Sequence, residues 1–504
     1  MQTNVLEYLE HTVGRVPEKI AFSDGTQNLT FSEVFHNAKA IGTKLLHDGL
    51  SNEPVVVFME KSPAAVNAFF GVLYAGCYYV CLDVEMPAFR IEMILSQLTP
   101  RAVICDAVTR PMLAQYGYTG EAYLFADCVT GEIDETALAA VRKAQIDTDP
   151  IYIVFTSGST GIPKGIIACH RSVIDYIEQL SETLGFSEDT VFGNQTPLYF
   201  DACLKELYPT LKFGAKTYLI PKQNFSFPTK LVEYLNTYRI NTVCWVVSAL
   251  TMISATGTLR TMKPEYLHTV AFGSEVFPVK QFHLWKAALP QAKFTNLYGP
   301  TEATGMSCYY HVLRDFEETE TIPIGRPFRN TAILLLNEQN QLAGKGEPGE
   351  ICIRGTCLTM GYYGQPDKTA EVFVQNPLQT RFNELIYRTG DIGQYNAEGE
   401  LMFISRKDYQ IKHMGHRIEL GEIEINGGLC EGVEAVGCIY DTDKGKIVLF
   451  YTGSAEKSAV AAYLKGRLPR YMQPNVIRQL EALPHTPNGK LDRKALVAIY
   501  KEQQ

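Results

Sequence analysis

The chain has 504 residues, of which 46% are hydrophobic and 20% charged, and its formal net charge is −9. The composition is that of a globular chain, and the length predicts two to four domains or subdomains. The negative charge argues against a nucleic-acid partner, and the lack of any apolar run of about eighteen residues argues against a membrane span.

The sequence also bears on the compartment. Residues 1–7 lack the basic segment followed by an apolar one that marks a signal peptide. Twelve cysteines are scattered between Cys77 and Cys438, and none forms a C-x-x-C pair, so redox and zinc motifs are not expected. Cys105 and Cys244 stand in apolar runs and are predicted to be buried thiols. We therefore expect a cytoplasmic protein.

Short apolar runs alternate with helix-like segments in the first part of the chain. Residues 55–59 form such a run, residues 63–74 follow as a helix-like segment, and residues 102–105 and 217–220 are further short runs. Short continuous apolar strands between helices predict a mostly parallel sheet with helices packed on it. The expected fold class is therefore α/β for this large N-terminal part.

A loop rich in hydroxyl groups and glycine follows the apolar run 151–155. Residues 156–165 read Thr-Ser-Gly-Ser-Thr-Gly-Ile-Pro-Lys-Gly. Glycine lets a backbone approach a ligand closely, and consecutive N–H groups and hydroxyls form a concavity suited to phosphate oxygens. Lys164 adds a positive charge. The pattern differs from a Walker A loop, and the alternative interpretation is a flexible surface loop of small residues.

Past residue 330 the pattern changes. Residues 331–336, 349–354 and 401–404 are apolar runs separated by Gly, Asn and Glu turns, which is typical of an antiparallel subdomain. We predict a domain boundary at Asp408. Residues 1–407 would form the large domain, and residues 408–504 a small α+β domain.

Seven further segments belong to one pattern with the loop. They are Leu29–Glu33, Tyr74–Val80, Asn296–Glu302, Tyr387–Asp391, Arg406–Lys412, Arg417–Glu422 and Pro487–Arg493. In order and spacing they resemble the signatures of the adenylate-forming superfamily, which comprises acyl-CoA synthetases, luciferases and the adenylation domains of nonribosomal peptide synthetases. The resemblance extends from about residue 10 to residue 494. It is strongest to the branch that activates amino acids, including stand-alone D-alanine–carrier-protein ligases.

This resemblance implies a two-step reaction with ATP and Mg²⁺. A carboxylate attacks the α-phosphate of ATP to give an acyl-adenylate and pyrophosphate, and a thiol then takes the acyl group and releases AMP. The small domain would rotate about the hinge residue Asp408. The resemblance assigns ATP binding to Thr156, Ser157, Gly158, Ser159, Thr160, Gly161, Lys164, Gly273, Ser274, Glu275, Asn296, Tyr298, Gly299, Thr301, Asp391, Phe403 and Arg406.

Three of the matching residues are candidates for catalysis. Thr301 would contact the α-phosphate, and Glu302 would bind Mg²⁺, for which one or two carboxylates with phosphates are adequate. Lys490 would bridge the substrate carboxylate and the ribose, and stabilise charge in the transition state. The alternatives are a helix N-terminal charge for Glu302 and a solvated lysine for Lys490. Tyr298 and Asp391 are assigned to ATP binding, and the alternative interpretations are a tyrosine of the hydrophobic core for Tyr298 and a turn residue for Asp391.

The segment Phe200–Ala202 resembles the signature of amino-acid activators, in which Asp201 would pair with the α-ammonium group. Alternatively, Asp201 and Lys205 form an i,i+4 pair on a helix. The resemblance assigns the substrate pocket to Asp201, Ala202, Lys205, Trp245, Val270, Phe272, Leu297, Gly305, Met306 and Lys490.

The pocket residues favour a small or an acidic side chain. Several of them are bulky and leave little room. A buried lysine needs a partner, so Lys205 favours a substrate carboxylate. Alternatively, Lys205 pairs with Glu206, Asp201 or Glu275, and the substrate is small and neutral, such as alanine.

The acceptor thiol is expected on a separate partner. The sequence contains no phosphopantetheine-serine motif, so we expect a separate carrier protein with phosphopantetheine, or coenzyme A. Met414 stands where the peptide-synthetase pattern commonly has arginine, which leaves the surface facing that partner open. The alternatives are an acyl- or aryl-CoA synthetase, in which no ammonium group has to be bound, and a degenerate family member that serves as a binding protein.

Overall fold

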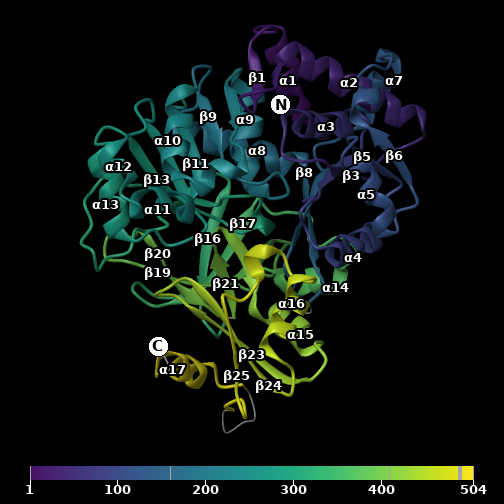
Figure 1. Ribbon diagram of the computed structural model, residues 1–504. Helices are drawn as coiled ribbons and strands as arrows, with labels where there is room; N and C mark the ends of the chain where they lie inside the picture. Colours follow the sequence, from purple (N-terminus) through teal and green to yellow (C-terminus); the bar gives the residue numbers. More distant parts are fainter. Residues whose placement is uncertain (1, 159–160, 408, 486–490, 503–504) are drawn as a thin grey trace.

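The computed structural model describes residues 2–158, 161–407, 409–485 and 491–502 (Figure 1). Two large sheets with helices packed against them form the N-terminal part, an antiparallel sheet follows, and a small α+β unit ends the chain. The predicted α/β class with an antiparallel subdomain is confirmed. Within the described residues, no helix is long and apolar enough to cross a bilayer.

The first sheet has six strands, and its neighbours run parallel except for the last pair. In spatial order they are β6 (Glu121–Leu124), β5 (Ala102–Cys105), β3 (Pro54–Phe58), β4 (Tyr78–Cys81), β7 (Pro150–Thr156) and β8 (Lys164–Cys169). The helices of this region are α2 (Phe31–His47), α3 (Pro63–Tyr74), α4 (Ala88–Leu98), α5 (Arg110–Leu113), α6 (Phe125–Cys128) and α7 (Glu135–Ala144). All five residues of β3 are buried, as a central strand of a covered parallel sheet requires.

The second sheet has nine strands with a parallel centre and antiparallel ends. In spatial order they are β15 (Arg326–Pro327), β14 (Cys308–His311), β13 (Lys293–Tyr298), β12 (Thr269–Gly273), β11 (Thr242–Val246), β9 (Val191–Asn194), β10 (Lys216–Leu219), β1 (Ile20–Ser23) and β2 (Asn28–Thr30). Its helices are α1 (Leu6–Val13), α8 (His170–Leu184), α9 (Leu204–Phe213), α10 (Pro228–Thr237), α11 (Val247–Ala255), α12 (Thr258–Thr261) and α13 (Val279–Ala288).

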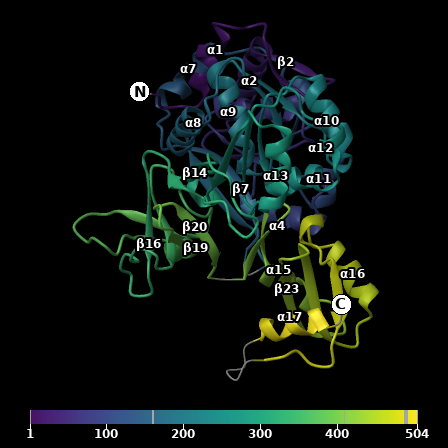
Figure 2. The same cartoon turned by 90° about the vertical axis from the view of Figure 1, so that its left-hand side faces the viewer.

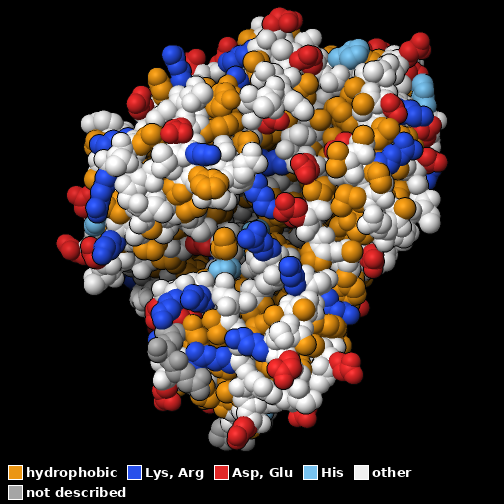
Figure 3. Space-filling model, viewed as in Figure 1, with side chains coloured by type: hydrophobic (Ala, Val, Ile, Leu, Met, Phe, Trp, Pro, Cys, Tyr) orange, Lys and Arg blue, Asp and Glu red, His pale blue; other side chains and the backbone are white. Residues whose placement is uncertain are grey.

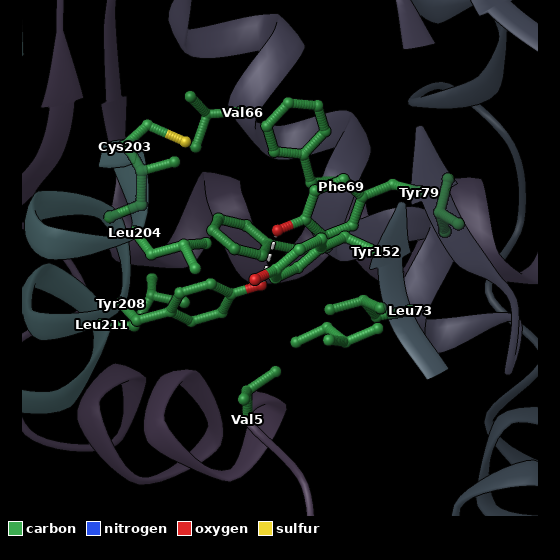
Figure 4. Close-up of a cluster of buried hydrophobic side chains, with 14 of the residues drawn as sticks. Val5, Val66, Phe69, Leu73, Tyr79, Tyr152, Cys203, Leu204, Tyr208 and Leu211 are labelled. Atoms are coloured by element: carbon green, nitrogen blue, oxygen red, sulfur yellow. Dashed lines mark hydrogen bonds between the residues drawn. The ribbon is translucent and has the colours of Figure 1, made fainter. Parts of the chain in front are cut away.

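One hydrophobic cluster joins the two large sheets (Figure 4). Phe69 stacks on Tyr79 with ring centroids 4.3 Å apart, and the hydroxyl groups of Tyr79 and Tyr208 lie 3.2 Å apart. Tyr152 of β7 and Leu204 of α9 belong to the same cluster. Because both sheets share this core, the loops at the ends of β7 and β13 are held in a fixed relation to each other.

The antiparallel sheet consists of β16 (Thr331–Leu336), β17 (Gly349–Gly355), β18 (Phe373–Gln375), β19 (Leu385–Tyr395) and β20 (Leu401–Arg406), with α14 (Pro366–Val372) before β18. It brings Asp391 of β19 and Arg406 of β20 into register opposite each other. The pairing shifts between Ile392 and Gly393, so a bulge follows Asp391. A turn residue is the alternative interpretation of Asp391, and the structure places Asp391 inside the long strand β19.

The C-terminal unit begins with the hairpin of β21 (Gln410–His413) and β22 (His416–Glu419). There follow α15 (Leu420–Gly428), β23 (Val433–Asp441), β24 (Lys446–Gly453), α16 (Lys457–Lys465), β25 (Val476–Gln479) and α17 (Arg493–Glu502). Figure 2 shows this unit set apart from the two large sheets. Two hydrophobic clusters contain only residues after position 410, so the unit has its own core. Asp408, the predicted hinge, lies outside the described residues, and the boundary at that residue stays a prediction.

Candidate active site

A cleft opens where the carboxyl ends of several parallel strands meet the β21–β22 hairpin. Figure 3 shows this face of the molecule hollowed between the N-terminal part and the C-terminal unit, with Lys and Arg side chains gathered there. Crevices at the carboxyl ends of parallel strands are where α/β folds bind ligands. The residues that line the cleft are Phe155, Thr156, Ser157, Gln195, Thr196, Pro197, Phe200, Asp201, Ala202, Val246, Ser274, Gly299, Pro300, Thr301, Gly305, Met306, Asp391, Arg406, Lys412, Met414, Gly415, His416, Arg417 and Tyr471.

The glycine- and hydroxyl-rich loop meets the C-terminal unit directly. The Ser157 hydroxyl donates a hydrogen bond to the carbonyl oxygen of Arg417 at 2.8 Å, and the amide of Gly158 donates one to Glu422 at 3.1 Å. The other carboxylate oxygen of Glu422 pairs with the buried guanidinium of Arg90. The loop therefore offers its donors to a carboxylate of α15 in this structure.

Other loop residues lie on the same side of the cleft. Gly161 has φ +78°, a conformation that suits glycine, and a side chain there would meet Ile425. The Lys164 ammonium lies 4.0 Å from a carboxylate oxygen of Glu419, and burial lowers its pKa from the usual range. Ser159 and Thr160, two of the predicted ATP contacts, lie outside the described residues.

Glu302 is fully buried in the short turn of 3₁₀ helix (Thr301–Ala303) that follows β13. Its carboxylate accepts hydrogen bonds from Arg417 at 2.7 Å and from the Tyr362 hydroxyl at 2.9 Å. Burial alone would raise the pKa of Glu302, but the charges of Arg417 and Lys164 outweigh burial and lower the pKa to about 2. Glu302 is thus a fixed negative charge. Glu302 supplies one carboxylate next to hydrogen-bond donors that suit phosphate oxygens. This arrangement fits a Mg²⁺ site whose other ligands are phosphate oxygens.

Asp391 forms the second charged centre. It accepts hydrogen bonds from the Tyr298 hydroxyl and from Arg406, both at 2.6 Å. The ammonium group of Lys412 lies over the rings of Tyr298, at 5.3 Å, and Phe403, at 5.7 Å. Burial lowers the pKa of Lys412. Tyr298, Asp391 and Arg406, which the resemblance assigns to ATP binding, are therefore in contact with one another, and the Lys412 ammonium of the C-terminal unit lies over the Tyr298 ring.

The remaining predicted nucleotide contacts lie between β12 and the turn after β13. Ser274 lines the cleft with φ +68°, and Glu275 accepts hydrogen bonds from the amides of Ser248 and Gly415. The Asn296 amide donates to the carbonyl oxygen of Pro323 at 2.9 Å. Gly273 and Gly299 are positions where the backbone approaches other backbone atoms, because an added Cβ would lie 2.3 Å from the Leu297 oxygen and 2.5 Å from the Gly305 oxygen, respectively.

The predicted substrate pocket divides into a lining and a layer behind it. Asp201, Ala202, Gly305 and Met306 line the cleft. Five others are buried and are absent from the lining within the described part of the chain: Lys205, Trp245, Val270, Phe272 and Leu297. The indole N–H of Trp245, for example, donates to the carbonyl oxygen of Gly193 at 2.6 Å. The strands β11, β12 and β13 thus turn these apolar side chains into the cores on either side of the sheet.

Asp201 lines the cleft and lies close enough to the buried Lys205 for their charges to interact. Burial raises the pKa of Asp201, and the charge of Lys205 and the Thr301 hydroxyl oppose that rise. Burial likewise raises the pKa of Glu206 to about 7, again opposed by Lys205. Among the described residues, no salt bridge within 4.0 Å joins Lys205 to a carboxylate. Glu275, one of the alternative partners of Lys205, accepts hydrogen bonds from two backbone amides instead. Lys205 is 2% exposed, so it is a buried cation near two carboxylates without a direct contact to either.

Four residues in or beside the cleft were not assigned a role from the sequence. Arg417 lies in one of the matching segments, but its contact with Glu302 depends on how the two parts of the chain meet. No sequence motif around Tyr362, Tyr471 or Gln195 indicates that these residues lie at the site. Lys490 lies outside the described residues. Its described neighbours His485 and Leu491 pair with each other, and no described residue after Tyr471 lines the cleft.

Comparison with known proteins identifies the family. Residues 9–363 match the family described as "AMP-binding enzyme". Tyrocidine synthase 1 of Brevibacillus parabrevis is 31% identical over 98% of this chain, and the chain spans 45% of that relative's length. Zwittermicin A synthase ZmaJ of Bacillus cereus is 30% identical over 99% of this chain and 95% of its own length.

A solved structure shares the fold. The adenylation domain AlmE of Vibrio cholerae, in complex with glycyl-adenosine-5′-phosphate, is 21% identical, with a TM-score of 0.83 over 100% of this chain and 98% of its own. Both curated relatives are named as synthases. The chain therefore belongs to the AMP-binding enzymes, the adenylate-forming superfamily, and it is an AMP-forming ligase.

Proposed function

We propose that this protein joins an amino acid to AMP at the expense of ATP and then passes the aminoacyl group to the phosphopantetheine thiol of a separate carrier protein. The observation that carries the proposal is that Asp201 opens into the same cleft as Ser157, Thr301 and Asp391. An anionic contact for an α-ammonium group thus lies beside donors suited to phosphates. A fatty or aryl acid has no group that needs Asp201.

The residues divide the work of the first step. The loop from Thr156 to Lys164 holds the β- and γ-phosphates, Thr301 contacts the α-phosphate, and Asp391 accepts hydrogen bonds from the ribose hydroxyls. Lys490 stabilises the charge that develops as the substrate carboxylate attacks. Glu302, which stays ionised at any working pH, would hold Mg²⁺, and the bound ion would neutralise phosphate charge.

The arrangement seen here suits the second step. Arg417 donates a hydrogen bond to the carboxylate of Glu302, the group proposed to bind metal. The amide of Gly158, proposed to bind phosphate, donates to Glu422. The phosphates of ATP and this arrangement therefore compete for the same partners. Release of pyrophosphate frees those partners, and rotation about Asp408 then exchanges Lys490 for the hairpin that carries Lys412 and Gly415.

The chemistry around Lys205 favours an acidic amino acid. Lys205 is buried, and no carboxylate among the described residues contacts it directly. A buried cation is expensive unless it is paired. With the α-ammonium on Asp201, a short side chain that ends in a carboxylate would bring a negative charge close to Lys205, which lies behind the cleft lining. A small neutral amino acid would leave Lys205 unpaired.

The compartment is part of the same proposal. All twelve cysteines are buried free thiols, which fits the reducing cytoplasm.

Exchange of labelled pyrophosphate into ATP tests the proposal across a panel of D- and L-amino acids, β-amino acids, aryl acids and fatty acids. We expect exchange with an acidic amino acid. Exchange only with acids that lack an amine would refute the role of Asp201 and would place the protein among the CoA synthetases. The same assay with Lys164→Ala is the control for exchange that depends on this cleft.

A further inference from the structure

One ionisable side chain on the rim of the cleft is not used by the scheme above. His416 is the first residue of β22, and its ring lines the cleft beside Gly415. Tyr471 stacks on it with centroids 3.7 Å apart and planes inclined by 7°, and Phe200 meets it edge-on at 4.9 Å. The two aromatic rings fix the orientation of the imidazole.

The imidazole is not satisfied by its surroundings. Its Nδ1 atom is buried, and among the described residues it has no hydrogen-bond partner. Nothing in the neighbouring fold therefore accounts for a polar ring at this position, where the stacking on Tyr471 would suit a purely aromatic side chain equally well. A buried polar atom without a partner costs free energy, and a ligand bound in the cleft would offset this cost by supplying the missing contact.

The other ionisable groups of the cleft are engaged or carry a positive charge. Asp391 accepts from Tyr298 and Arg406. Lys412 and Arg417 are donors only. Asp201 is reserved for the substrate ammonium. His416 is thus the group on the hairpin that offers a neutral nitrogen lone pair to a molecule in the cleft.

We propose that His416 accepts the proton of the attacking thiol in the transfer step. This inference rests on the proposed function. The sulfur forms a bond to the carbonyl carbon of the adenylate, and the bond from that carbon to the phosphate oxygen breaks with its electron pair. AMP leaves with one more negative charge, and the thiol proton moves to the imidazole. No electron transfer and no further reactant are needed.

Electrostatics keep the ring of His416 neutral and also make it a weaker base than a free imidazole. Burial, followed by the charges of His413 and Lys222, lowers the pKa of His416 to about 3, so the ring is neutral and holds its lone pair at any working pH. The ionisable groups packed near it are Tyr471 on its face, His413 on the same hairpin, and Lys222, which pairs with Glu85. The charge that builds up on the departing AMP stabilises the imidazolium as it forms, which offsets part of that low pKa.

The test separates the two steps of the reaction. His416→Phe keeps a ring for Tyr471 to stack on, His416→Gln keeps a polar group, and His36→Phe removes an exposed histidine as the matched control. The aminoacyl-adenylate is formed first, and its single-turnover reaction with pantetheine is followed from pH 6.5 to pH 9.5. Pyrophosphate exchange is measured on the same preparations and reports whether each variant is folded and competent in the first step.

The expected result is normal exchange in all variants and transfer about 100-fold slower in both His416 variants near pH 7, the usual scale of general-base catalysis. The deficit narrows as the pH approaches about 8.5, the ordinary pKa of a thiol, because thiolate then forms without help. Equal transfer by wild type and His416→Phe, or a deficit that stays constant with pH, would overturn the inference. Absence of exchange in the wild type would instead overturn the proposed function, and the role of His416 with it.

Discussion

The Arg90–Glu422 pair makes the clearest prediction about the two parts of the molecule. Arg90 of α4 is 3% exposed and Glu422 of α15 is 1% exposed, and the second oxygen of Glu422 binds the amide of Gly158. The pair therefore fastens the C-terminal unit to the loop proposed for phosphates. Replacement of Arg90 by methionine removes the cation and leaves the carboxylate buried.

The size of the effect follows from burial. Loss of one partner of a buried ion pair costs about 3–5 kcal/mol. The lower end applies here, because burial already raises the pKa of Glu422 and the stranded carboxylate can take up a proton. A loss of about 3 kcal/mol destabilises the conformation in which the C-terminal unit contacts the loop. The equilibrium then shifts about 100-fold toward a conformation in which this contact is open.

The assay compares the two steps. In Arg90→Met we expect transfer to the thiol to slow by up to about 100-fold, while pyrophosphate exchange stays near the wild-type rate. Arg171→Met is the matched control, because Arg171 pairs with Asp147 on the surface and such pairs contribute about 0–1 kcal/mol. Transfer at the wild-type rate, or an equal loss of both steps, would refute the coupling of this pair to the second step.

Three more predictions concern single residues. Lys490→Ala should reduce pyrophosphate exchange to near background while nucleotide binding, measured by calorimetry, and the unfolding midpoint stay unchanged; normal exchange would remove Lys490 from the mechanism. Lys205→Ala should move the preference in the exchange panel from acidic to small neutral amino acids, and an unchanged preference would make Lys205 a structural residue. Because the pKa of Glu302 lies near 2 in the folded protein, below its ordinary value near 4.5, its ionisation adds stability above pH 4.5 that is lost as the pH falls toward 2. In urea unfolding, the wild type should therefore lose about 2 kcal/mol more stability between pH 5 and pH 3 than Glu302→Gln, and parallel losses would contradict the low pKa.

The secondary structure around β3 could be predicted because its signals are local. The apolar run 55–59 corresponds to β3 (Pro54–Phe58), and the helix-like segment 63–74 is α3. The Ser62 side chain accepts from the amide of Ala65 and Pro63 occupies the first turn, so the start of α3 is fixed by adjacent residues. The loop and Thr301 follow the ends of β7 and β13, so their approach to one cleft could be expected, whereas Asp391 lies inside β19 and reaches the cleft through the packing of the antiparallel sheet.

The ion pairs between distant segments could not be predicted in this way. Glu302 and Arg417 are 115 positions apart, and they meet only because the C-terminal unit rests on the cleft. The same holds for Arg90 and Glu422, which are 332 positions apart. Trp245 is likewise buried behind the cleft by residues distant in sequence, because it packs in a hydrophobic cluster and its indole N–H donates to the carbonyl oxygen of Gly193 on a neighbouring strand. Sequence patterns specify residue types for a site, and the packing of separate units decides which of them face it.

The central claim, that Asp201 selects an amino acid, is tested most directly by pyrophosphate exchange with one pair of substrates. The pair is the best amino acid of the panel and the same acid without its α-amino group, each given to the wild type and to Asp201→Ala. We predict strong exchange only for the wild type with the amino acid, since only that pair joins an ammonium group to a buried carboxylate. Equal exchange with the acid that lacks the amine, or an Asp201→Ala variant as active as the wild type, would contradict the account.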